Sequence, residues 1–201
     1  MPRPLLICDC DEVLVQFIAP FEAYLAREGY SLSFNSLEFA GNIRHEETGA
    51  YPDRKAVREL LFRFFDAHLE ETPLMPGAAQ ALQQISEVAD IVILTNIDAE
   101  HRERRAQALA AAGMPYRVLS NRGLKGKAVQ ELAAACTGPW LFVDDLSLHH
   151  QSVAATCPDV NRLHFVADPR IQQLVPDCPE ANARFTTWED ALPWALSALS
   201  R

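Results

Sequence analysis

Two continuous apolar runs in this chain each end on a pair of carboxylates. They are residues 5–8, before Asp9 and Asp11, and residues 140–143, before Asp144 and Asp145. Runs of this kind are typical of strands that are buried on both faces of a parallel sheet. Because side chains along a strand alternate between its faces, Asp9 and Asp11 should point the same way. Neighbouring carboxylates repel each other and resist desolvation, so the pattern predicts a site for a hard cation such as Mg²⁺.

Strand-like runs alternate with helical patterns along most of the chain. Further strands are expected at residues 91–94, 116–119, 163–166 and 184–186, and helices at 78–85, 100–112, 125–136, 148–155 and 189–199. This alternation predicts an α/β fold with a Rossmann-like, mainly parallel sheet and helices on both faces. Ligands of such sheets bind beyond the carboxyl ends of the strands, where Asp9, Thr95 and Asp144 fall.

Residues 16–73 differ in character from the sequence on either side. Phe17, Phe21, Tyr24 and Leu25 recur at helical spacing, and apolar residues between 57 and 69 mark a strong amphipathic helix. Residues 31–53 read as irregular. We therefore expect a small helical insertion at 16–73, within a core domain made of residues 1–15 and 74–201.

The composition of the chain argues against several kinds of partner and indicates where the protein is found. A net charge of −9 argues against binding to nucleic-acid polymers. Membrane partners are not expected, because no run approaches the roughly 20 apolar residues needed to cross a bilayer. The N-terminus lacks the pattern of a signal peptide, so a cytoplasmic protein is expected. Its five cysteines contain no CxxC pair, and we interpret Cys8 and Cys10 as small core residues.

The candidate site residues form an ordered series of motifs. They are Asp-x-Asp after the first strand, Thr95 after the second, a lysine that opens a later helix, and Asp144-Asp145. This series resembles the haloacid dehalogenase superfamily, whose members are mostly Mg²⁺-dependent phosphohydrolases. The insertion at 16–73 falls where that family places its helical C1-type cap. The resemblance implies a phosphatase that acts on a small phosphorylated metabolite with Mg²⁺ as its cofactor.

The resemblance also implies roles for the acidic residues. Asp9 would be the nucleophile that forms an aspartyl-phosphate, and Asp11 would be the acid/base, with its backbone carbonyl on the metal. Asp144 and Asp145 would complete the metal site with Asp9. Which of the two binds the metal directly is left open.

Three further positions would contact the phosphate. By the same resemblance, Thr95 offers its hydroxyl and Asn96 its backbone N–H to phosphate oxygens, while a lysine neutralises charge on the phosphoryl group and on Asp9. Lys125 and Lys127 are both candidates for that lysine. The Lys125-Gly126 pair matches the family's usual helix start better, which favours Lys125.

Two features depart from the family pattern. Glu12 stands where glycine is usual, and it either faces solvent in the turn or places a third carboxylate beside the site. His149 and His150 stand where many members carry an acid, and we expect them on the surface of a helix.

Substrate choice is expected to depend on the insertion. The candidate residues there are Phe17, Phe21, Asn42, Arg44, His45 and Tyr51. Arg44 and His45 could reach a distal anionic group, or belong to a solvated loop. Phe17 could contact the substrate, or belong to the core. A fainter resemblance to the 5′(3′)-deoxyribonucleotidase-like branch makes a nucleotide one candidate substrate.

Two other functions fit the same fold. One is a phosphomutase, and the other is a non-catalytic binding protein that retains the fold. The oligomeric state, monomer or homodimer, is left open.

Overall fold

The computed structural model describes residues 3–36, 38–134, 136, 138–175 and 177–200. Within these ranges, six parallel strands form one sheet in the order β5-β4-β1-β6-β7-β8. They are β1 (Leu5–Cys8), β4 (Asp90–Thr95), β5 (Arg117–Ser120), β6 (Trp140–Asp144), β7 (Asn161–Phe165) and β8 (Ala183–Phe185). The predicted α/β fold with a parallel sheet is therefore confirmed.

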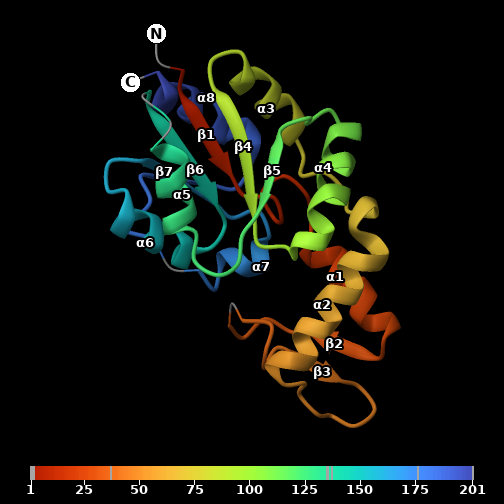
Figure 1. Ribbon diagram of the computed structural model, residues 1–201. Coiled ribbons are helices and arrows are strands. Elements are labelled where there is room, and N and C mark those ends of the chain that lie inside the picture. Colours follow the sequence, from red (N-terminus) through yellow and green to blue (C-terminus); the bar gives the residue numbers. More distant parts are fainter. Residues whose placement is uncertain (1–2, 37, 135, 137, 176, 201) are drawn as a thin grey trace.

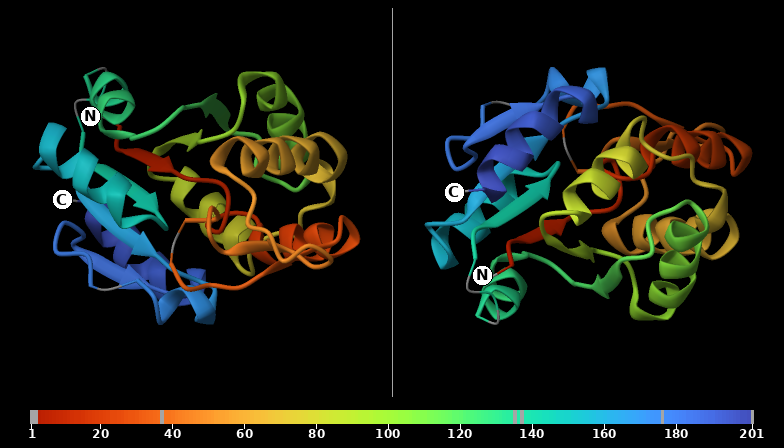
Figure 2. Two further views of the ribbon diagram at one scale, coloured as in Figure 1. Left: turned by 90° about the horizontal axis from the view of Figure 1, so that it is seen from below. Right: turned by 90° about the horizontal axis from the view of Figure 1, so that it is seen from above.

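Helices cover both faces of this sheet (Figure 2). Leu6 and Cys8 of β1 belong to a buried layer with α3 (Ala78–Ser86), α4 (Arg102–Ala111) and α8 (Trp188–Leu199). Leu5 and Ile7 belong to the opposite layer, with α5 (Gly126–Ala133) and α6 (Ser147–Thr156). The alternation along one strand thus fills two cores, as expected for a strand buried on both faces. Cys8 and Cys10 are fully buried and free, in line with their interpretation as core residues.

The segment that follows β1 lies at the carboxyl ends of the strands (Figure 1). It contains α1 (Ile18–Arg27), β2 (Tyr30–Leu32), β3 (Ile43–His45), α2 (Arg54–His68) and the 3₁₀ turn η1 (Leu69–Glu71). β2 and β3 pair antiparallel, with Tyr30 opposite His45. The expectation that residues 31–53 are irregular is wrong at β2 and β3, where a short hairpin extends the hydrophobic cluster formed by α1 and α2.

Two chain segments connect this insertion to the sheet, and they run side by side. Gln16 N–H donates to the Pro73 carbonyl at 2.8 Å, and Met75 N–H donates to the Leu14 carbonyl at 2.8 Å. Between these bonds, Val15 and Leu74 form an antiparallel bridge. We call residues 14–16 and 73–75 the paired linker.

Several element boundaries differ from the expectations. The helix expected from residue 100 begins as a 3₁₀ turn, η2 (Ala99–His101), and α5 ends at Ala133 rather than near residue 136. A short helix, α7 (Pro169–Gln172), was not expected. In the described part of the chain, no helix is both long and apolar enough to cross a membrane.

Candidate active site

A buried lysine lies between two carboxylates at the carboxyl end of the sheet. Lys125 Nζ is 2.7 Å from Asp9 Oδ1 and 2.7 Å from Asp144 Oδ2. Asp9 follows β1, Asp144 ends the neighbouring strand β6, and Lys125 directly precedes α5. Burial alone would lower the pKa of Lys125, but Asp144 and Asp9 raise it above its ordinary value. The lysine therefore stays charged and holds the two carboxylates together.

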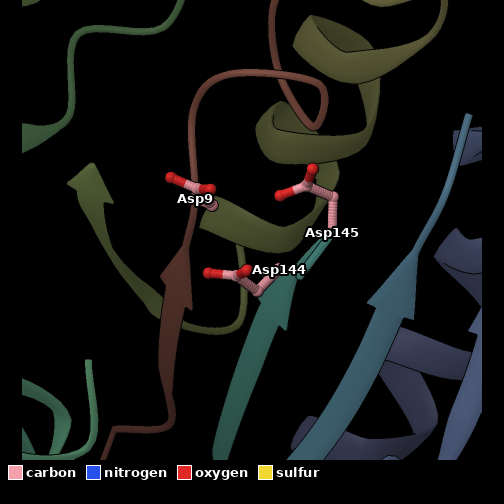
Figure 3. Close-up of side chains that lie close together, drawn as sticks. All are labelled: Asp9, Asp144 and Asp145. Atoms are coloured by element: carbon pink, nitrogen blue, oxygen red, sulfur yellow. The ribbon is translucent and has the colours of Figure 1, made fainter. Parts of the chain in front are cut away.

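Asp145 adds a third carboxylate to this group (Figure 3). Oxygens of Asp9, Asp144 and Asp145 all lie within 4.8 Å of one another. Burial raises the pKa of Asp9 to about 7 against the opposing effect of Lys125. Burial, followed by repulsion from Asp144, raises the pKa of Asp145 as well. Because one ammonium cannot neutralise three carboxylates, this oxygen-only donor set fits a hard divalent cation such as Mg²⁺.

The backbone of the acidic pair is fixed by buried histidines. His150 Nε2 lies 3.0 Å from the Asp144 carbonyl, and His164 Nε2 lies 2.8 Å from the Asp145 carbonyl. Burial lowers the pKa of His150 to about 4, so the ring is neutral near pH 7 and can donate its N–H to the carbonyl. His149 and His150 are both buried, so their expected place on a helix surface is wrong.

The carboxylate of Asp11 belongs to a second group, centred on Arg105 of α4. Arg105 donates from Nη2 to Asp11 Oδ1 at 2.9 Å and from Nη1 to Thr72 Oγ1 at 3.1 Å. Thr95 Oγ1 lies 3.5 Å from Asp11 Oδ2. The guanidinium also lies over the Phe65 ring, 5.8 Å from its centroid. Arg105 is 1% exposed, so it is a buried cation that joins Asp11 to Thr72, beside the paired linker, and to α2.

A cavity of about 500 Å³ opens beside these carboxylates. Its sheet side includes Asp9, Asp11, Asn96, Asp145 and His149, and its opposite side includes Phe17, Phe34, Phe39, Leu61 and Phe65 of the insertion. One cavity therefore has a polar floor formed by the core and an apolar wall formed by the insertion.

No family model matches this sequence, and no curated protein matches it. Solved structures do match it over nearly its whole length. The candidate hydrolase YfnB from Bacillus subtilis, solved with bound magnesium, has a TM-score of 0.68 at 14% identity, over 97% of this chain and 99% of its own. A candidate phosphoglycolate phosphatase from Lactobacillus delbrueckii has a TM-score of 0.66 at 13% identity, over 100% of both chains.

A third similar structure is a candidate β-phosphoglucomutase from Thermotoga maritima. Its TM-score is 0.60 at 15% identity, over 98% of this chain and 100% of its own. This chain has the haloacid dehalogenase fold. The expected resemblance is thus confirmed for the fold, and at these identities the likeness concerns the fold alone.

Glu12 has a structural role in this version of the haloacid dehalogenase fold. Its φ of 60° lies in the left-handed region that favours glycine. Its side chain is buried, and Oε1 accepts hydrogen bonds from Phe17 N–H and Ile18 N–H, both at 2.7 Å. Burial raises the pKa of Glu12 despite these two bonds. Of the two alternatives for Glu12, exposure to solvent is wrong, because the start of α1 needs an acceptor that no residue at its own N-terminus supplies. The other alternative is confirmed, since Glu12 lines the cavity beside Asp9 and Asp11.

Three predicted site residues lie away from the cavity. Lys127 is exposed, and its Nζ lies 3.8 Å from Glu131 Oε1, so Lys125 is the lysine at the carboxylates. Arg44 is exposed and donates from Nε to the Gly49 carbonyl at 3.3 Å. His45 Nδ1 accepts from Thr48 N–H at 3.3 Å. The hairpin of β2 and β3 uses these two side chains locally, and neither lines the cavity.

Of the other candidate residues, two line the cavity and two lie outside it. Phe17 and Asn96 line the cavity. The side chain of Asn96 also donates to the Gly123 carbonyl at 3.0 Å and accepts from Asn121 at 2.7 Å. Phe21 is fully buried against Phe17, and Tyr51 is exposed.

Arg105 is the site residue that sequence reasoning missed. It lies in an alanine-rich helix next to Arg102 and Arg104, where an arginine looks like a surface charge. One signal was present, because Arg105 is four residues before the buried Leu109 and so lies on the same apolar face of α4.

Proposed function

We propose that this protein is a Mg²⁺-dependent phosphatase that hydrolyses a small phosphomonoester through an aspartyl-phosphate on Asp9. The position of Lys125, 2.7 Å from both Asp9 and Asp144, is the observation that carries the proposal. It supports Asp9 as a nucleophile because the ammonium offsets the negative charge that an incoming phosphoryl group would add. The fold it shares with a candidate phosphatase and a magnesium-bound hydrolase supports the same reading.

The first half-reaction transfers the phosphoryl group to Asp9. Asp9 Oδ1 is held by Cys10 N–H at 2.7 Å and by Lys125, so Oδ2 is the proposed attacking oxygen. It forms a bond to phosphorus while the ester P–O bond breaks. Asp11 donates a proton to the departing oxygen, which leaves as a neutral alcohol.

The second half-reaction returns Asp9 to its starting state. Asp11, now a carboxylate, takes a proton from a water molecule, and that water attacks phosphorus and breaks the bond to Asp9. Inorganic phosphate leaves. Asp9, Asp144 and Asp145 would hold Mg²⁺, with the Asp11 carbonyl as the further ligand that the resemblance implies, and the ion would neutralise charge on the phosphoryl oxygens.

Arg105 and Thr95 serve as positioning residues for Asp11 in this scheme. Arg105 holds one carboxylate oxygen at 2.9 Å, and the Thr95 hydroxyl lies 3.5 Å from the other. A carboxylate fixed at both oxygens has one orientation in which to pass a proton to the leaving group.

The test is phosphate release from a panel of phosphomonoesters, with Mg²⁺ and with EDTA, for the wild type and for Asp9→Asn. We expect metal-dependent release by the wild type and a loss of at least about 10³-fold in the variant. Lys127→Ala is the matched control and should retain wild-type activity, because its side chain is exposed outside the cavity. Undiminished release by Asp9→Asn would rule out the nucleophile.

The two alternative functions give different results in the same assay. A phosphomutase would need a bisphosphate activator and would release little phosphate. A non-catalytic binding protein would release none from any compound and would show no difference between the wild type and Asp9→Asn.

A further inference from the structure

We propose that the substrate of this site is a monoester whose leaving group is neutral and apolar, an alkyl or aryl phosphate. This inference rests on the proposed phosphatase function and adds the substrate class. It comes from the wall that faces the carboxylates across the cavity. The insertion supplies Phe17, Phe34, Phe39, Leu61 and Phe65 to that wall, and Ile171 of α7 lies in the same apolar cluster.

The aromatic part of the wall is already assembled. The Phe17 ring stacks on Phe65 at a centroid distance of 5.5 Å and meets the edge of Phe39 at 5.8 Å. The loop that bears Phe39 is held by the buried Asn42. The side-chain amide of Asn42 donates to the carbonyls of Ser36 and Glu38, both at 2.7 Å. A wall fixed in this way can bind an apolar group without first being ordered.

In the described part of the chain, the lining of the cavity offers no unpaired cation for a second anionic group. Among the described residues that line it, Arg54 is the one cation, and its Nη2 is 2.9 Å from Glu38 Oε2. Both of these side chains lie at the rim, 81% and 65% exposed. Lys125 and Arg105 are already paired with Asp9, Asp144 and Asp11. A distal carboxylate or second phosphate would therefore be desolvated without a counter-charge.

A cationic leaving group is also poorly matched. Glu12 Oε1 already accepts two backbone N–H groups, and Glu38 is paired with Arg54. The wall opposite the carboxylates is mainly hydrocarbon, which stabilises a neutral apolar group through burial.

The first experiment compares matched substrates with the Mg²⁺-loaded wild type. We expect kcat/KM to rise about fourfold per added methylene group from ethyl to hexyl phosphate. The kcat/KM for ethyl phosphate should exceed that for phosphoglycolate, which carries a carboxylate on a carbon chain of the same length. The kcat/KM for 3,3-dimethylbutyl phosphate, whose leaving group is uncharged, should exceed that for phosphocholine, whose leaving group has the same shape and a positive charge.

The outcomes separate the inference from the function on which it rests. Higher kcat/KM for phosphoglycolate or phosphocholine than for its neutral match would overturn the apolar assignment and leave the phosphatase intact. Phosphate release from none of these compounds would overturn the phosphatase, and the substrate class with it.

A variant of the wall provides the second experiment. Leu61→Lys on α2 places a cation in the cavity, so kcat/KM should fall at least about tenfold for hexyl phosphate and rise for phosphoglycolate. Val88→Lys adds the same charge at an exposed residue outside the cavity and the insertion, and it should change neither value. A misfolded variant would lose both activities, whereas an unchanged ratio in a folded Leu61→Lys protein would overturn the inference.

Discussion

The side chain of Arg105 meets three parts of the molecule at once. Its guanidinium contacts Asp11 in the loop after β1, Thr72 beside the paired linker, and the Phe65 ring on α2. Burial alone would lower the pKa of Arg105, but Asp11 raises it, so the guanidinium remains charged beside that carboxyl group. Removing one partner of a buried ion pair leaves the other charge uncompensated, which makes this pair sensitive to substitution.

We expect Arg105→Lys to lower kcat for an alkyl phosphate by about 10²-fold, because lysine keeps the charge but cannot hold both Asp11 and Thr72. The same variant should transfer the phosphoryl group from p-nitrophenyl phosphate to Asp9 at a nearly normal rate, because that leaving group departs without a proton, whereas hydrolysis of the aspartyl-phosphate still needs Asp11 as the base. Rapid-mixing kinetics, which resolve the burst of p-nitrophenolate from the steady state, measure this difference. A burst slowed as much as the steady state would mean that Arg105 supports the fold rather than the orientation of Asp11.

Glu12 yields a prediction about stability. Glu12→Ala removes the acceptor for Phe17 N–H and Ile18 N–H, and we expect a loss of about 1–2 kcal/mol in the free energy of unfolding. Glu12→Gln keeps an acceptor oxygen at nearly the same place and should lose much less. Urea unfolding of the two variants measures the difference, and equal losses would show that the charge matters rather than the hydrogen bonds.

At the scale of elements, the contact between α5 and α6 places Lys125. Gly126 N–H donates to Ser152 Oγ at 2.9 Å, and a Cβ at residue 126 would collide with the carbonyl and hydroxyl oxygens of Ser152. Only glycine permits the start of α5 to lie this close to α6. Because Lys125 directly precedes this contact, the close approach brings its ammonium to Asp9 and Asp144.

We therefore expect Gly126→Ala to destabilise the protein by about 1–3 kcal/mol and to reduce kcat, because α5 must shift away from α6 and carry Lys125 with it. Thermal unfolding and phosphate release measure the two effects. Lys127→Ala, one residue further along α5, is the control and should alter neither. A Gly126→Ala protein with normal kcat would mean that the position of Lys125 does not depend on this contact.

At the scale of the whole molecule, the three carboxylates link metal binding to folding. Mg²⁺ at about 100 times its Kd should stabilise the folded protein by about 2.7 kcal/mol and raise Tm by about 5–10 °C relative to EDTA. Asp145→Asn should reduce this increase by removing one ligand. In EDTA the same variant should be at least as stable as the wild type, because repulsion among Asp9, Asp144 and Asp145 is relieved. Calorimetry with and without metal checks both expectations.

Much of the sheet could be predicted because its strands are buried on both faces. The runs at residues 5–8 and 140–143 are uniformly apolar, and parallel strands bring the residues at their carboxyl ends together. Asp9, Thr95 and Asp144 are therefore placed at one edge by local patterns alone. β2 and β3 are only three residues each and partly exposed, so their patterns were too weak to identify.

The parts of the site that could not be predicted depend on contacts between distant residues. Arg105 meets Asp11 across 94 positions of sequence, and nothing near Arg105 indicates that partner. In the sequence, Glu12 resembles an ordinary turn residue. Its role as the acceptor for Phe17 N–H and Ile18 N–H becomes evident only when the start of α1 is placed beside it.

For Arg44 and His45 the sequence suggested a function that the structure does not support. Their polar side chains, in a segment with no assigned structure, suggested contact with an anionic ligand, but in the fold they contact Gly49 and Thr48 next to β3.

The paired linker limits how the insertion can move relative to the sheet. Two chains joined by backbone hydrogen bonds at 2.8 Å resist sliding past each other, yet the ribbon they form can bend. Displacement of the insertion therefore reduces to rotation about an axis near Val15 and Leu74, with little translation. One distance, measured between a label on α2 and a label on α8, would report that rotation through a whole turnover.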